Sequence, residues 1–84
     1  MPTEVVHFYK LELNTMRDIK DFVDIAITIE EPLMLTDGEG YTVSAKSLMG
    51  AIYALEWNEL YLTSKSDIYF AFQKYIKSST IRYI

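Results

Sequence analysis

Apolar residues are frequent along Glu4–Leu11, the first patterned segment of the chain. If side chains alternate between two faces, one face holds Val5, His7, Tyr9 and Leu11, and the other holds Val6 and Phe8. Alternation predicts a strand. Apolar residues on both faces are typical of a strand in the middle of a sheet, where both sides are covered.

Thr15–Ala26 predicts an amphipathic helix, because its apolar residues recur at steps of three and four. Its start is typical of a helix N-terminus: either Asn14 or Thr15 can cap it, and Thr15 with Asp18 three residues later resembles a capping box. The stripe expected to be buried consists of Met16, Ile19, Phe22, Val23 and Ala26.

The remainder of the chain predicts shorter elements. They are a strand at Leu33–Thr36, a turn at Asp37–Gly40, a strand at Tyr41–Val43, a helix at Ser47–Leu55, a strand at Glu59–Thr63 and a last helix starting at Ser66 or Asp67. The last helix is expected to bury Ile68, Ala71, Phe72, Tyr75 and Ile76, and the short tail 78–84 is compatible with extended backbone. Helices interspersed with mostly antiparallel strands predict an α+β domain of two layers.

Length and composition exclude several classes of protein. The 84 residues fit a single domain, 1–84. The absence of cysteine excludes disulfides and thiolate metal sites, and one histidine with scattered carboxylates shows no ligand spacing, so we expect no metal and no cofactor. A net charge of −4 argues against nucleic acid as a partner. The chain begins without a signal-peptide pattern and has no apolar run of membrane-spanning length, which favours a cytoplasmic protein without a membrane partner.

The segment Ser44–Gly50 reads Ser-Ala-Lys-Ser-Leu-Met-Gly. Together with Arg17, the Phe22-Val23 pair and the order of elements, it resembles HPr, the histidine-containing phosphocarrier of the bacterial phosphoenolpyruvate-dependent sugar phosphotransferase system. The resemblance covers nearly the whole chain in element order. It implies an open-faced sandwich in the order βαββαβα, with a four-stranded antiparallel sheet and three helices on one face. The tail 78–84 would then be an extension past the family's final helix.

The family's reactive histidine lies just before the first helix, in a run of the form Gly-Leu-His-Thr-Arg-Pro. Aligned on the Phe-Val pair, that run falls on Leu13–Asp18, where the arginine is kept as Arg17 and the histidine becomes Thr15. A threonine hydroxyl is a weak nucleophile without an adjacent base, and Asp18 adds negative charge where a phosphate would bind. We therefore expect Thr15 to cap the helix and not to carry phosphate. Arg17 is either an anion ligand or an ordinary surface arginine.

The second helix begins at Ser47, and the resemblance gives this serine a possible regulatory role. In Gram-positive members of the family, the serine at this position is phosphorylated by a dedicated kinase, and the product binds a transcriptional regulator. A phosphate at a helix N-terminus adds roughly −1.5 to −2 charge where hydrogen bonds are available to it. The alternative is that Ser47 serves only as the helix cap.

The same helix carries more apolar side chains than one buried face can use. Leu48, Met49 and Ile52 are expected to form an exposed patch that docks a partner protein, because exposed apolar patches usually mark contacts and methionine suits adaptable ones. The matching positions dock partner enzymes in the HPr family. The alternative is a deeper core in which these side chains pack toward Trp57 and Tyr61.

Three functions are compatible with these residues, none of them that of an enzyme. The first is a regulatory or docking protein that has lost histidine phosphotransfer, similar to the catabolite-repression HPr-like protein. Its partners would be phosphotransferase-system proteins, a serine kinase or a transcriptional regulator. The second is a structural or self-associating domain, since seven tyrosines exceed what so small a core can hold and favour a homodimer. The third is a phosphocarrier that uses another residue. His7 lies too far before the helix for this role and is expected to be a packed or half-exposed strand residue.

Overall fold

The computed structural model describes residues 4–83 of the chain. Strand β1 (Val5–Leu11) is followed by helix α1 (Met16–Ile27). The elements that come next are β2 (Met34–Thr36), β3 (Thr42–Ser44), α2 (Leu48–Ala54), β4 (Tyr61–Ser64), the 3₁₀ turns η1 (Tyr69–Ala71) and η2 (Gln73–Tyr75), and β5 (Ile76–Tyr83). Residues 1–3, at the start of the predicted domain, and Ile84, the end of the predicted tail, lie outside this range.

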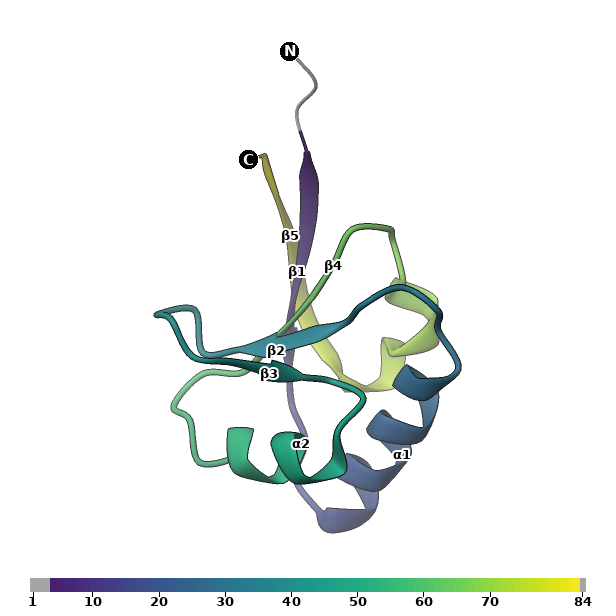
Figure 1. Cartoon of the computed structure of the whole chain (residues 1–84), viewed down its shortest axis with the longest axis vertical. Helices are drawn as coiled ribbons and strands as arrows, with labels where there is room; N and C mark the ends of the chain where they lie inside the picture. The colour runs from purple at the N-terminus through teal and green to yellow at the C-terminus, as the bar shows by residue number, and fades with distance from the viewer. Residues whose placement is uncertain (1–3, 84) are drawn as a thin grey trace.

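The strands of residues 4–83 form a five-stranded antiparallel sheet in the order β3-β2-β4-β1-β5. β1 lies between β4 and β5, so the predicted central position of this strand is confirmed. The register places Tyr9, Leu62 and Leu35 in one row across β1, β4 and β2. These three side chains are buried in the core that they share with α1 and α2, and both helices lie on the same side of the sheet (Figure 1). The chain is therefore an α+β fold with an open antiparallel sheet.

Helix α1 begins where the sequence predicted it, because the capping box forms. The Thr15 hydroxyl accepts a hydrogen bond from the Asp18 amide (3.1 Å), and the Asp18 carboxylate accepts one from the Thr15 amide (3.3 Å). Four residues of the predicted stripe are buried, but Met16 is exposed, because the first turn of α1 extends beyond the sheet (Figure 1). The four buried residues are Ile19, Phe22, Val23 and Ala26.

The predicted last helix was wrong: residues 69–75 form two 3₁₀ turns, and the chain then continues as strand β5. Residues 68–76 are mostly aromatic or β-branched, and such residues have low helix propensity. Their backbone is also bonded to β1 and the residue after it. The Ile68 amide donates to the Tyr9 hydroxyl (3.0 Å), and the Tyr75 carbonyl accepts from the Glu12 amide (2.9 Å). Phe72 and Tyr75 are buried as predicted, whereas Ala71 is exposed.

Strand β5 is the second departure from the expected four strands and three helices. Residues 76–83 pair along the whole of β1, from Leu11 with Ile76 to Val5 with Tyr83, with a bulge near Lys77. Without β5, this edge of β1 would leave its backbone groups without partners in the sheet. Within the described residues the fold therefore has five strands and two α-helices, and most of the predicted tail is part of the sheet.

Candidate functional site

Thr15 lies at the N-terminus of α1 and is fully engaged as a cap. Besides the capping box, the Asp18 carboxylate accepts a hydrogen bond from the amide of Asn14 (3.0 Å). The amides of Asn14, Thr15 and Asp18 are thus bonded to side chains of the same turn. This arrangement gives Thr15 and Asp18 a structural role at the start of α1.

A cleft of about 770 Å³ opens beside this helix N-terminus. One wall comes from the loop before α1 and from α1 itself, and the other from η2 and the start of β5. Across the cleft, Lys74 forms an ion pair with Asp21 (2.9 Å), and Lys77 forms one with Glu12 (3.2 Å). The hydroxyl of Tyr75 donates a hydrogen bond to Asp21 (2.6 Å). The cleft therefore joins segments from opposite ends of the chain.

The electrostatics of this cleft are nearly balanced. A hydrogen bond from the Tyr75 hydroxyl, and then one from the Lys74 ammonium group, hold the pKa of the Asp21 carboxyl below its ordinary value. Burial, and then the neighbouring Asp21 carboxylate, raise the pKa of the Tyr75 hydroxyl. Arg17 also lines the cleft, and none of the ion pairs among residues 4–83 involves it. Since the two lysines are paired with carboxylates, Arg17 would bind an anion with little help from its neighbours.

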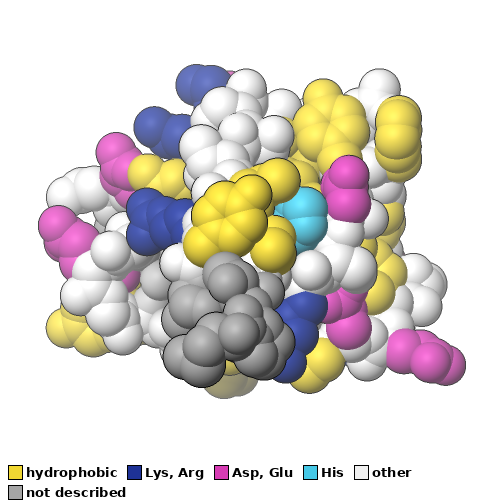
Figure 2. Space-filling view, turned by 90° about the horizontal axis from the view of Figure 1, so that it is seen from above, with side chains coloured by type: hydrophobic (Ala, Val, Ile, Leu, Met, Phe, Trp, Pro, Cys, Tyr) yellow, Lys and Arg dark blue, Asp and Glu magenta, His cyan; other side chains and the backbone are white. Residues whose placement is uncertain are grey.

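His7 lies on β1, far from this cleft. It pairs with Ser64 of β4 and Ile81 of β5, and its ring stacks parallel to that of Tyr9 with 6.0 Å between the centroids. Figure 2 shows the histidine, in cyan, beside hydrophobic and acidic side chains in the view from above, whereas α1 begins at the lower end of Figure 1. His7 is half-buried, which agrees with the strand role predicted for it.

Ser47 is the N-cap of α2. Its hydroxyl accepts a hydrogen bond from the amide of Gly50 (3.0 Å), so the capping role predicted for this serine is confirmed. The preceding lysine does not lie against this hydroxyl. Lys46 reaches the end of α1 instead, where its ammonium group donates to the carbonyls of Ile29 and Glu30. The Ser47 side chain is half-buried.

The exposed apolar residues of α2 lie next to Ser47. Met49 is 82% exposed, and Leu48, Ile52 and Tyr53 are also exposed, whereas Ala51 and Ala54 form the buried face. α2 has two buried residues in seven, so the sheet and α1 do not absorb its remaining apolar side chains. The alternative of a deeper core around Met49 was therefore wrong.

An aromatic cluster continues this apolar surface beyond α2. The ring of Tyr53 meets that of Trp57 edge to face at 6.1 Å, and Trp57 stacks on Tyr41 at 6.3 Å. Tyr53 and Tyr41 are exposed and Trp57 is half-buried. The alternative of a deeper core had placed Trp57 against the apolar side chains of α2. In the structure Trp57 contacts Tyr53 of α2 and also Tyr41, just before β3.

Two features of the described residues bear on other classes of protein. No helix among residues 4–83 is both long enough and apolar enough to cross a membrane. The same residues contain no group of three His, Asp or Glu side chains placed to hold a metal ion.

No protein-family model, curated protein or solved structure matches the chain. The cleft beside α1 and the exposed apolar surface of α2 are therefore the candidate sites of this chain.

The sequence predicted the residues at the two helix N-termini and the exposed side chains of α2, but not the partners that α1 meets. Lys74, Tyr75 and Lys77 face α1 and the loop before it because residues 73–77 turn into β5. Their carboxylate partners are far away in the sequence, so no local pattern pointed to them. In the sequence, the acidic residues of α1 stand out only as scattered carboxylates.

Proposed function

We propose that this chain is an HPr-like docking protein, cytoplasmic and without histidine phosphotransfer, which binds a partner protein through Leu48, Met49 and Ile52. The observation that carries the proposal is the exposure of these side chains: Met49 is 82% exposed on a helix whose buried face needs only alanines. An exposed apolar surface of this kind on a small protein usually marks a contact. Methionine adapts its shape to different partners because its side chain is long and unbranched.

The absence of histidine phosphotransfer is supported by the chemistry of the two candidate positions. Thr15 has no imidazole, and a threonine hydroxyl is a weak nucleophile without an adjacent base. His7 is stacked on Tyr9 in the sheet, away from the helix N-terminus that would stabilise a phosphate. In the α1 cleft, the carboxylates of Glu12 and Asp21 take up the lysines, which leaves little positive charge for an incoming phosphoryl group.

Ser47 would act as the switch of the docking surface. Its hydroxyl lies at the start of the same helix, and the residues that follow it directly are Leu48 and Met49. Phosphorylation would place a charge of roughly −1.5 to −2 at the edge of the apolar patch. Such a charge would favour a partner that presents arginine or lysine beside an apolar groove. It would repel an acidic partner and disfavour a purely apolar one, against which the charge would lose its water.

The test is phosphorylation of the purified chain by an HPr serine kinase with ATP. We expect label on Ser47 and none on a Ser47→Ala variant. A Met49→Lys, Ile52→Lys double variant should be labelled at least about tenfold more slowly, since it places charge on the docking surface. A Phe70→Lys variant is the matched control, because Phe70 is 85% exposed on η1 and lies outside the patch. It should be labelled at the rate of the unmodified chain.

A second incubation, with phosphoenolpyruvate and the first enzyme of the phosphotransferase system, tests the carrier alternative. We expect no label on this chain. Acid-labile phosphate on it would contradict the proposal and restore the carrier function. Failure of the serine kinase to label the folded, unmodified chain would contradict the regulatory switch.

A further inference from the structure

The two edges of the sheet differ strongly in length. One edge is β3, which has three residues, and the other is β5, which has eight. An edge strand presents unpaired backbone amides and carbonyls that can pair with another strand, and proteins commonly protect such edges by keeping them short. β3 has this protection and β5 does not.

β5 is exposed along almost its whole length. From Lys77 to Tyr83 every residue is exposed, and the middle of the strand, Ser78–Ile81, carries no charge and no proline. Lysine, proline and strong bulges are the usual means of blocking edge pairing. The irregularity that β5 does contain lies at its beginning, near Lys77, so residues 78–83 remain regular and available for pairing.

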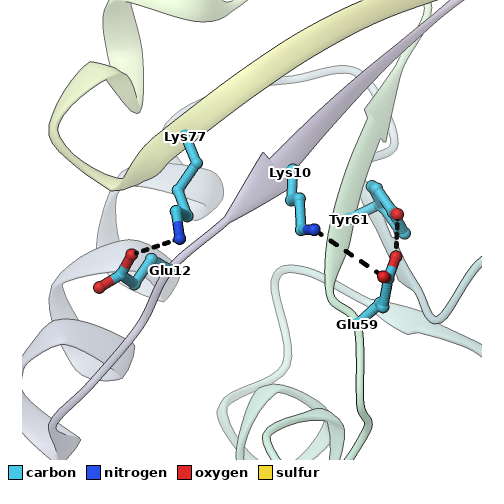
Figure 3. Close-up of polar contacts among 5 residues, drawn as sticks. All are labelled: Lys10, Glu12, Glu59, Tyr61 and Lys77. Carbon is cyan, nitrogen blue, oxygen red and sulfur yellow. Dashed lines mark hydrogen bonds and ion pairs between the residues drawn. The ribbon is translucent and has the colours of Figure 1, made fainter.

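The two charged side chains of β5 are held away from its outer edge. Lys77 points back across the sheet to Glu12 and pairs with it at 3.2 Å, as Figure 3 shows. The guanidinium group of Arg82 lies over the ring of Phe8 on β1, 4.2 Å from its centroid. Both charged groups therefore lie toward β1 and away from the outer edge of β5. The outer edge of β5 is left without the charge that would repel an incoming strand.

We propose that β5 is a dimerisation edge, at which it pairs in antiparallel orientation with β5 of a second copy of this chain. The pairing joins two sheets into one continuous sheet around a two-fold axis. It stops at two copies, because the remaining edge of each protein is the three-residue β3. A two-fold axis uses the same surface on both copies, so the interface must be complementary to itself.

Among the registers that keep like charges apart, we choose the one centred on Thr80, because it places two threonines opposite each other. If Thr80 faces Thr80 of the second copy, Arg82 faces Ser78 and Ile81 faces Ser79. No like charges are then directly opposite, and the central threonine pair is a favourable cross-strand combination. Residues facing each other lie on the same side of the joined sheet, so the helices of both copies cover the same side.

The first measurement is sedimentation equilibrium of the whole chain over a wide range of concentrations. We expect the mass to rise from that of one chain to that of two and no further. A Thr80→Lys variant should raise the dissociation constant at least about tenfold, because it places two positive charges directly opposite each other. A Thr42→Lys variant on β3 is the matched control and should dimerise like the unmodified chain. Circular dichroism confirms that both variants are folded.

The second measurement fixes the register, and it is clean because the chain has no cysteine of its own. A Thr80→Cys variant should form a disulfide-linked dimer under mild oxidation, since directly opposed residues have Cβ atoms about 4.5–5.5 Å apart. A Thr42→Cys variant should remain largely uncrosslinked. A chain that is monomeric at every concentration would overturn the proposal. So would a dimer that is insensitive to Thr80→Lys, or a monomer that pairs with a foreign peptide strand. None of these results bears on the α2 surface, which the kinase assay reads separately.

Discussion

At the scale of the residue, the hydroxyl of Tyr9 connects the centre of the sheet to the segment after β4. The Tyr9 ring is buried, and its hydroxyl donates to the Asp67 carboxylate (3.0 Å) while it accepts the amide of Ile68 (3.0 Å). Asp67 in turn accepts the amide of Tyr69 (3.0 Å). A buried hydroxyl costs free energy unless it is bonded in this way. The bonds hold residues 67–69 against β1 and direct the chain into the 3₁₀ turns.

We expect Tyr9→Phe to lower the free energy of unfolding by about 1–3 kcal/mol. The substitution keeps the buried ring but leaves the Ile68 amide without its acceptor, and an unsatisfied buried donor costs about that much. Urea unfolding followed by circular dichroism measures the change. Tyr41→Phe is the control, because Tyr41 is exposed, and surface substitutions usually change stability by less than about 0.5 kcal/mol. If Tyr9→Phe lowers the free energy of unfolding no more than Tyr41→Phe does, the Tyr9 hydroxyl does not stabilise the fold.

At the scale of the element, the sequence correctly predicted those helices and strands whose formation depends on local interactions. α1, α2 and the β2–β3 hairpin formed as expected, because each depends on a cap or turn within a few residues, such as Thr15 with Asp18 or Ser47 with Gly50. Residues 66–83 could not be predicted in the same way. Their apolar spacing fits a helix, but the free edge of β1 competes for them, and that competition depends on contacts from the other end of the chain.

The element-scale prediction concerns β5 as part of the fold. Removing residues 78–84 should lower the free energy of unfolding by at least about 2 kcal/mol, because several ladder hydrogen bonds worth about 0.5–1.5 kcal/mol each are lost. The Phe8 ring also loses Arg82, which lies over it. Urea unfolding and amide hydrogen exchange of β1 measure the effect. A full-length Ser78→Ala, Thr80→Ala variant, which keeps the backbone pairing, is the control. If truncation leaves stability unchanged, the segment is a dispensable extension.

At the scale of the whole molecule, carboxylates connect segments that are far apart in the sequence. Asp21 of α1 binds Tyr75 and Lys74, and Glu31 after α1 accepts the amide of Lys65 after β4 (3.0 Å). The sequence showed these acidic residues only as a dispersed negative charge. Their partners emerged from the sheet order, which brings residues 64–77 back against α1 and the loop that follows it. This is also why the sequence singled out only Thr15, Arg17 and Asp18 in this region, and not the residues that face them across the cleft.

The pH dependence of stability follows from the same carboxylates. Hydrogen bonds from Tyr75 and then Lys74 lower the pKa of Asp21, and bonds from the Tyr69 amide and then Tyr9 lower that of Asp67. In the unfolded chain both groups return to ordinary values near about 4. A carboxyl whose pKa is lower when folded contributes stability above its unfolded pKa, and this contribution is lost as the pH falls through the folded value. The urea midpoint should therefore be nearly constant from neutral pH to about pH 5 and fall below about pH 4.

An Asp21→Asn, Asp67→Asn variant should be less stable at neutral pH and show a shallower fall, whereas Glu39→Gln, in the exposed turn before β3, should keep the original slope. A double variant with an unchanged slope would show that these two carboxylates do not control acid unfolding.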